Sequence, residues 1–330
     1  MGLCCRRFLR LAACTAVIST VAQFALAQSY PSRPVTMVVP FAVGGSSDVA
    51  GRVIATRVSE ILGQQIVVEN VGGAGGMIGA SRVAKGAPDG YQFVLGGVGT
   101  HAQNQTLYKK PLYNAATDFA PVVLLAEQPM VLVVRKNFPG NNLQEFVAFV
   151  KANQEKIRYG STGAGSSSHV SCALLNAAIG INVTHVSYRG GGAVTQDLLA
   201  GLIDYSCYNG PGAISLIEGN LAKPIATLTK GRSTILPGLA SSHEQGLINF
   251  EVDSWLGFFF PKRTPTPIVQ KLHDAAVAAL DSPILQDRLK ELGVVPVEPE
   301  RRSPEYLQRF VEIQVAKWAG AIKAAGISAD

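Results

Sequence analysis

Short apolar runs alternate with helical patterns along most of the chain. The run Val35–Val39 is followed by a Gly/Ser loop and then by apolar residues at helical spacing that stop at Gly63. Further patterns predict strands over 65–69 and 91–95, with a helix over 78–84 between them. Repeated strand, helix, strand units are typical of an α/β fold, so we expect a parallel sheet with helices on both faces.

The second half of the chain repeats this pattern. A helix over 142–151 precedes a strand over 157–160, a Gly/Ser loop and a helix over 168–178. Between the halves, the apolar run 122–134 is interrupted by Pro129 and two polar neighbours, which favours two strands over one helix. One more extended segment follows over 250–261. After it we expect helices only, over 267–280, 283–292 and 303–325.

These patterns predict two α/β lobes joined by two crossings of the chain. We expect the chain to enter the second lobe near residue 128 and to return near residue 251. Domain 1 then comprises residues 28–127 and 252–330, and domain 2 comprises residues 128–251. Two crossings make a hinge with a cleft between the lobes.

The N-terminus has the pattern of an export signal. Three arginines precede an uncharged run over 11–26, so we expect a signal peptide over 1–27 and a mature chain that begins at Gln28. A retained anchor is the alternative, although about 16 apolar residues fall short of the roughly 20 that span a bilayer. A lipoprotein signal ending at Cys14 and twin-arginine export are further alternatives with incomplete patterns.

Composition excludes several classes of protein. Of 330 residues, 47% are hydrophobic and 16% are charged, which excludes a disordered, collagen-like or coiled-coil chain. Loss of the three N-terminal arginines lowers the formal charge from +6 to +3 (6 − 3). Because this excess is small and no basic run occurs, we expect no nucleic-acid partner.

Only two cysteines lie beyond the predicted signal, Cys172 and Cys207. An exported protein folds in an oxidising compartment, where such a pair forms a disulfide more often than a metal site. Two buried free thiols are the alternative, because the sequence does not give the separation of the two Cα atoms.

Two Gly/Ser loops, 44–48 and 161–168, are candidate binding elements. Each follows a strand and begins a helix. Such loops present backbone N–H groups and hydroxyls at the positive end of a helix dipole, where a carboxylate or phosphate is stabilised. Helix capping is the alternative. We assign Asp48 to the cap and the two matching loops to ligand binding.

Motifs for catalysis and metal binding are incomplete. No G-x-S-x-G nucleophile elbow occurs, and the histidines and cysteines lack zinc-site spacing, so we expect no metal and no cofactor. His169 follows three serines and could act as a general base, but a capping or supporting role is the preferred interpretation. Gly73, Gly75 and Gly79 approximate a dinucleotide loop, but their spacing differs and favours a packed turn.

Five segments have a distinctive sequence: PFAVGGSSDVAGR (40–52), VVENVGGAGGMIGA (67–80), APDGYQFVLGGVGTHAQNQTLY (87–108), HVSYRGGGAVTQDLLAG (185–201) and KWAGAIKAAGI (317–327). Together they resemble the Bug-type solute-binding receptors of tripartite tricarboxylate transporters. The segments occur in the family's order over the whole mature chain, so the resemblance is specific.

The resemblance implies a periplasmic protein with a two-lobed α/β binding-protein fold of type II. It implies a small carboxylate held between two loops by backbone groups, hydroxyls and waters, for delivery to the membrane permease subunits of the transporter. We therefore expect a monomeric receptor and not an enzyme. The ligand-binding residues it implies are Phe41, Ala42, Gly45, Ser46, Thr100, His101, Ser161, Gly163, Ser166, His169 and Tyr208.

Some positions depart from the family pattern. Val43 stands where the family usually has Pro, and Gly51 where it usually has Ala, which alters loop stiffness more than chemistry. The pair at 71–72 replaces a common Arg-Pro and removes a charge. Tyr208 stands where many members have Asp, which leaves the identity of the ligand open.

Two other functions stay open at this point. An exported α/β enzyme acting on a carboxylate would use Ser166 and His169. A sensor subunit would present its ligand-bound form to a signalling partner instead of a permease. Turnover of a bound acid and trapping of the partner would distinguish these alternatives.

Overall fold

A computed structural model describes residues 30–248 and 250–329 of the chain. The predicted signal peptide, residues 1–27, lies outside the described residues. The compact unit that begins at Arg33 contains every element considered below. Within the described residues, no helix has the length and apolar character that a membrane crossing needs.

The first five strands and helices follow the sequence prediction closely. The strand β1 has the predicted bounds, and the helix α2 ends at Gly63, whose φ of 72° is left-handed and suits a residue without a Cβ. The elements are β1 (Val35–Val39), α2 (Ser46–Leu62), β2 (Ile66–Asn70), α3 (Met77–Ala84) and β3 (Gln92–Gly97).

The rest of the chain adds seven strands and eight α-helices within the described residues, together with a π-helical turn over Gly99–Gln103 and short 3-10 turns. They are α4 (Asn104–Leu107), β4 (Phe119–Arg135), α5 (Leu143–Ala152), β5 (Arg158–Ser161), α6 (Ser167–Ile179), β6 (Thr184–Ser187), α7 (Gly191–Ala200), β7 (Tyr205–Asn209), α8 (Gly210–Glu218), β8 (Ala222–Thr227), β9 (Asp253–Pro261), α9 (Thr266–Leu280), α10 (Pro283–Glu291), β10 (Val295–Pro296) and α11 (Pro304–Ala324).

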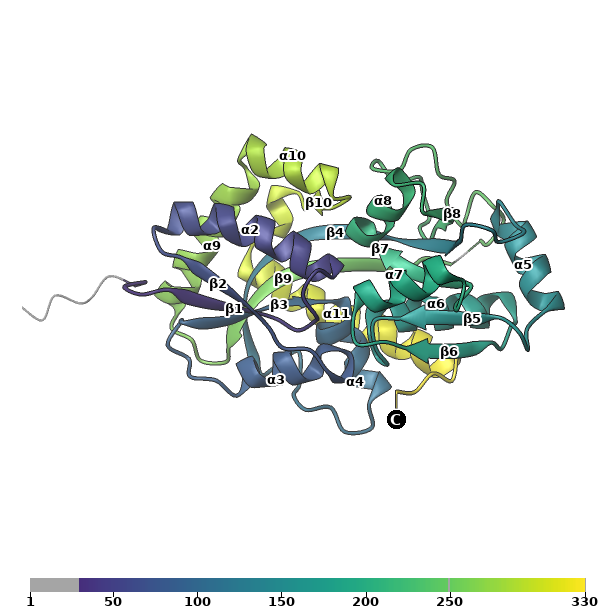
Figure 1. Ribbon diagram of the computed structural model, residues 1–330. Coiled ribbons are helices and arrows are strands. Elements are labelled where there is room, and N and C mark those ends of the chain that lie inside the picture. The colour runs from purple at the N-terminus through teal and green to yellow at the C-terminus, as the bar shows by residue number, and fades with distance from the viewer. Residues whose placement is uncertain (1–29, 249, 330) are drawn as a thin grey trace, which may run out of the picture. The chain divides into compact units, whose positions relative to one another are not determined.

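The strands form one mixed sheet with the order β2-β1-β3-β9-β4-β7-β5-β6. We call β1–β3 with α2, α3, α9 and α10 the first lobe, and β5–β8 with α5–α8 the second lobe. Strands within each βαβ unit pair in parallel, as predicted, but β4 and β9 pair antiparallel with their neighbours. The expected parallel pairing therefore holds within the lobes, whereas the two long strands that cross between the lobes, β4 and β9, make the sheet mixed (Figure 1).

The strand β4 corrects the prediction of two separate strands over 122–134. It runs without a break for 17 residues. Up to Pro129 it pairs with β9, and from Met130 it pairs with β7 and β8. Proline cannot donate a ladder hydrogen bond, and here it lies where the pairing partners change, so the strand continues through it.

A second correction concerns the C-terminal region, which we expected to contain helices only. The two-residue strand β10 pairs antiparallel with Glu127 and Ala126 of β4. A strand of two residues is too short to show a period-2 pattern, so no sequence signal predicts it.

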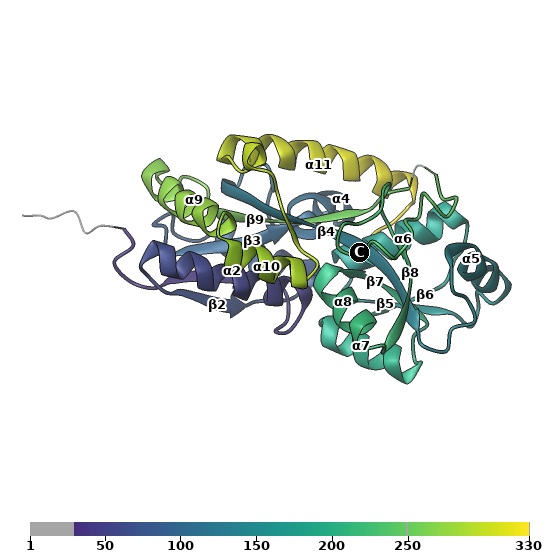
Figure 2. The same cartoon turned by 90° about the horizontal axis from the view of Figure 1, so that it is seen from above.

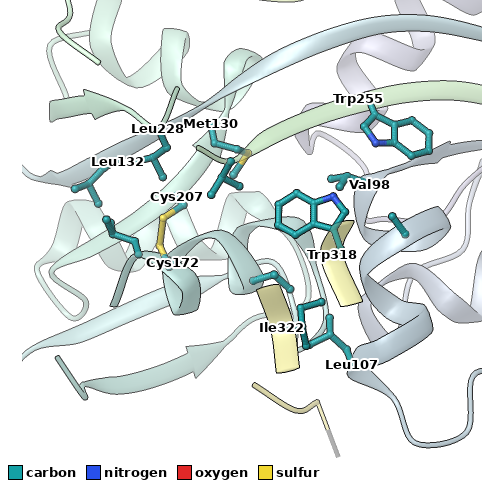
Figure 3. Close-up of a cluster of buried hydrophobic side chains, with 14 of the residues drawn as sticks. Val98, Leu107, Met130, Leu132, Cys172, Cys207, Leu228, Trp255, Trp318 and Ile322 are labelled. Atoms are coloured by element: carbon teal, nitrogen blue, oxygen red, sulfur yellow. A yellow bond between two sulfur atoms is a disulfide. The ribbon is translucent and has the colours of Figure 1, made fainter. Parts of the chain in front are cut away.

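The buried core explains on which side a cleft can open. One apolar cluster continues through both lobes on the face covered by α11, and it includes Trp318, Val98 and Leu132 (Figures 2 and 3). On the opposite face the apolar clusters are separate, one under α2 and α9 and the other under α7 and α8. The lobes are therefore joined along α11 and divided on the α2 and α8 side.

The structure joins Cys172 of α6 to Cys207 of β7 in a disulfide within this core (Figure 3). The two Cα atoms lie 5.6 Å apart, which is an ordinary separation for a bridge. Both cysteines have no exposed surface. The bridge ties the helix after the second Gly/Ser loop to the strand that contains Tyr208.

Candidate functional site

A cleft of about 430 Å³ lies between the two lobes on the divided side. This volume is in the range of small-molecule sites. Its lining comes from the β1–α2 loop, the β5–α6 loop, the β6–α7 loop and the β7–α8 turn. The lining residues are Phe41, Ala42, Gly44, Gly45, Ser46, Ser47, Val49, Thr162, Ser167, Ser168, Gly190, Gly191, Gly192, Thr195, Ser206, Cys207, Tyr208, Asn209, Pro211, Gly212, Ser215 and Leu292.

Four helices begin at this cleft, because residues of the first turns of α2, α6, α7 and α8 line it. The N-caps of α2, α7 and α8 provide no side-chain hydrogen bond to their helices. The N–H groups of a first helical turn have no partner within the helix, and the helix dipole adds a partial positive charge there. The cleft is thus surrounded by backbone donors.

The described residues that line the cleft include no charged side chain. The hydroxyls of Ser46, Ser47 and Ser167 have no hydrogen-bond partner among the described residues, so they are free to donate to a ligand. Others are already bonded, such as Ser206, whose hydroxyl donates to the Gly160 carbonyl oxygen over 2.7 Å. A carboxylate in the cleft would meet neutral donors only.

Asp48 stabilises the first binding loop through hydrogen bonds. Its carboxylate accepts hydrogen bonds from the Gly44 N–H at 2.8 Å, from Arg52 at 3.0 Å and from Asn70 at 2.8 Å. Burial by itself raises the pKa of Asp48, but these hydrogen bonds and the Arg52 charge lower it to below its usual value. Asp48 therefore orders the loop before α2 and is not among the residues that line the cleft.

Hydrogen bonds of Ser161, Ser166 and His169 order the second loop. The Ser166 hydroxyl donates to the Gly163 carbonyl oxygen at 2.6 Å and accepts from the His169 N–H at 3.3 Å. The Ser161 hydroxyl lies 2.7 Å from Nε2 of His185 and also donates to Gly163. Since Ser166 bonds to a carbonyl and Nδ1 of His169 accepts from Gly165, the two side chains do not form a nucleophile and base pair.

His169 and His185 stack on each other with ring centroids 4.2 Å apart. Burial lowers the pKa of each to about 4, and the neighbouring His185 adds to the effect on His169. Both rings are therefore neutral at pH 7. Neutral rings support the loop by packing and hydrogen bonding and do not supply charge to a ligand.

Thr100 and His101 lie deeper than the cleft. Thr100 lines a small cavity of about 10 Å³ behind Ser47 and Ser167. His101 has no exposed surface and stacks on Phe259 with centroids 3.9 Å apart, and burial lowers its pKa to about 3. This placement gives His101 a packing role, and contact between its ring and a ligand stays a prediction.

The structure brings five of the residues implied by the resemblance to the cleft: Phe41, Ala42, Gly45, Ser46 and Tyr208. Gly163 lines an adjoining cavity of about 770 Å³ that also includes Phe41 and Ala42. Ser161, Ser166 and His169 are not among the residues that line the cleft, and their side chains bond within the second loop and to its neighbours. Sequence reasoning missed the starts of α7 and α8, although Pro211, at the beginning of α8, is a helix-start signal.

No group of three or more potential metal ligands occurs among residues 30–248 and 250–329. The site is therefore defined by backbone N–H groups, hydroxyls and two aromatic rings. Two α/β lobes joined by long strands, with a neutral cleft where helices begin, define the solute-binding class of two-lobed proteins.

Comparison with known proteins agrees with this class. Over residues 50–327 the chain matches the family described as "Tripartite tricarboxylate transporter family receptor". It is 38% identical over 320 residues to the "UPF0065 protein in the TAR-I ttuE-ttuC' intergenic region" of Agrobacterium vitis, covering 97% of this chain and 92% of that protein. The chain belongs to this receptor family, whose members are solute-binding proteins and not enzymes.

Solved structures show the same fold. The periplasmic binding protein BugD is 39% identical and aligns with a TM-score of 0.87 over 91% of this chain and 99% of its own. MatC from Rhodopseudomonas palustris, solved with bound malate, is 38% identical and aligns with a TM-score of 0.86 over 89% of this chain and 100% of its own.

Proposed function

We propose that this protein is a periplasmic receptor that captures a small carboxylate in the cleft between its two lobes. The observation that supports the proposal most strongly is the convergence of four helix N-termini on one cleft whose lining, within the described part of the chain, has no charged side chain. Such a site stabilises an anion by dipoles and hydrogen bonds. The malate bound to MatC is consistent with this class of ligand.

The residues that line the cleft include donors for a carboxylate and apolar surface for the rest of the ligand. The backbone N–H groups of Ser46 and Ser167 and the free serine hydroxyls would hold the carboxylate. Phe41 and Tyr208 would contact the body of the ligand. Burial raises the pKa of Tyr208 to about 12, so its hydroxyl keeps its proton and can donate to an oxygen of the ligand.

Capture requires the lobes to move apart and together. β4 and β9 are the strands that run between the lobes, and their last mutual pair joins Pro129 to Asp253. We infer that the hinge lies there, with residues 28–127 and 252–330 on one side and residues 128–251 on the other. The shared core under α11 keeps the hinge side closed.

The partner and the location follow from the family. We infer that a signal over 1–27 directs export, that the mature chain begins at Gln28 as a monomer, and that it delivers its ligand to the permease subunits of a tripartite tricarboxylate transporter. The intact mass of the periplasmic protein tests whether the mature chain begins at Gln28. A diacylglyceryl adduct on a chain that begins at Cys14 would contradict this.

A thermal-shift screen tests the proposed ligand class. A ligand at 100 times its dissociation constant stabilises the folded state by about 2.7 kcal/mol, which gives a measurable rise in melting temperature. We expect at least one acid among dicarboxylates, tricarboxylates and aromatic acids to produce this rise without being consumed. If all these acids leave the melting temperature unchanged while sugars or nucleotides raise it, the proposal is wrong.

A further inference from the structure

The two lobes touch at two places where a glycine leaves no room for a side chain. A Cβ added to Gly75, in the loop between β2 and α3, would lie 2.7 Å from the carbonyl carbon of Gly165 and 2.9 Å from the carbonyl oxygen of Ala164. A Cβ added to Gly190, just before α7, would lie 2.7 Å from the Cβ of Ala42. Both separations are under 3.0 Å, which real Cβ atoms do not show.

These contacts are not adjustable by side-chain rotation. The atoms that face Gly75 belong to the backbone, and the atom that faces Gly190 is a Cβ, which no rotamer can move. The backbone at the first contact is also fixed by hydrogen bonds. The Tyr108 hydroxyl donates to the Ala164 carbonyl oxygen at 3.1 Å, and the Asn104 amide donates to the Gly75 carbonyl oxygen at 3.1 Å. A methyl group at either glycine would therefore separate the lobes.

The contacts lie beside the cleft. Ala42 and Gly190 both line it, and Gly75 and Ala164 line the adjoining cavity. The helix α2 belongs to the first lobe, whereas α6, α7 and α8 belong to the second. The N-termini of these four helices can therefore surround one ligand only when the loops of the two lobes are in contact.

We propose that Gly75 and Gly190 are positioning residues for ligand capture, because their missing side chains let the lobes close until all four helix N-termini reach the same anion. This inference rests on the proposed function, since it assumes that the cleft binds an acid. The extent of closure then sets the affinity for the acid, because each donor that stays out of reach leaves a carboxylate oxygen without a hydrogen bond to replace those it made with water.

Matched glycine variants test the proposal. Gly75→Ala and Gly190→Ala are compared with Gly180→Ala, a position with a similar positive φ of 68° against 60° at Gly75 but with open space around it. Gly231→Ala, also in open space, is the control with an ordinary backbone. The probe is whichever of succinate, malate, citrate and benzoate stabilises the unmodified protein most.

We expect Gly75→Ala and Gly190→Ala to raise the dissociation constant at least tenfold, and the two controls to change it less than twofold. Small-angle scattering should show that the probe makes the unmodified protein and the controls more compact, while the two variants stay extended. Dissociation constants of both variants within twofold of the unmodified protein would overturn the inference and leave the proposed function intact. If no acid binds to the unmodified protein, the proposed function itself fails.

The variant Ala42→Val distinguishes an effect on closure of the lobes from damage to the fold. It adds carbon on the other side of the Gly190 contact and leaves the glycine in place. We expect it to reduce the compaction by the probe as Gly190→Ala does, with a ligand-free melting temperature close to that of the unmodified protein. In the double variant the two effects should be smaller than their sum, because both act on one contact. Full compaction of Ala42→Val, or additive effects, would overturn the role of this contact.

Discussion

Reduction of the bridge between Cys172 and Cys207 should destabilise the protein strongly. The cysteines are 35 residues apart, and closing a loop of this length in the unfolded chain corresponds to about 4 kcal/mol in the chain-entropy model. This is a large part of the 5 to 15 kcal/mol that is typical for a folded domain. We expect the free energy of unfolding, measured in urea by circular dichroism, to fall by about that amount when dithiothreitol is added.

The same change should weaken ligand binding. Cys207 lines the cleft next to Tyr208, and Cys172 belongs to α6, whose first turn also lines it. Reduction loosens this link, so affinity should fall even where the protein stays folded. Two free thiols in the unfolded, unreduced mature chain would contradict the bridge. A change in unfolding free energy below about 1 kcal/mol on reduction would contradict the magnitude.

Three further predictions concern charge. Because the folded-state pKa values are about 3 for His101 and about 4 for His169 and His185, below the unfolded value of 6.5, the unfolded state binds more protons in acid. Stability should be full above pH 6.5 and fall towards pH 4, and urea unfolding that is unchanged between pH 7 and 4.5 would contradict this. Succinate should bind more tightly than aspartate in calorimetry, since none of the described residues that line the cleft is an acid that could meet an ammonium group. Tyr208→Asp should narrow the difference in affinity, and tighter aspartate binding by the unmodified protein would refute this prediction. Asp48→Ala should cost about 1 to 3 kcal/mol of stability and weaken binding, because the Gly44 N–H loses its acceptor; unchanged urea unfolding would show that the loop orders itself without Asp48.

Most of the fold could be predicted because local signals agreed with it. The apolar run Val35–Val39 and the stop at Gly63 gave β1 and α2 at or near their true bounds. The strand β4 was harder, since Pro129 looks like a break in the sequence. Only the change of pairing partners makes proline acceptable there, and partners are a tertiary property that one sequence does not contain.

The candidate site could be predicted in part. The β1–α2 loop was recognisable because glycine and serine before a helix indicate free backbone donors. The family resemblance implied ligand contacts for Thr100 and His101. The π-helical turn that follows β3 buries both side chains, so their contact with a ligand stays a prediction. The start of α7 was missed, because three successive glycines at 190–192 do not distinguish a loop from a helix N-terminus.

The measurement that tests the central claim most directly is calorimetry on Ser47→Asp, with Ser303→Asp as its control. Both serines lie at helix starts, where an acidic side chain favours the helix, so both variants should fold. Ser47 lines the cleft, whereas Ser303 caps α11 outside it. A carboxylate at position 47 would repel an anionic ligand and occupy its donors. If the cleft holds a carboxylate, Ser47→Asp should lose at least 100-fold in affinity for the strongest acid of the screen, while Ser303→Asp binds one acid per chain as the unmodified protein does. Equal affinity in both variants would contradict the claim.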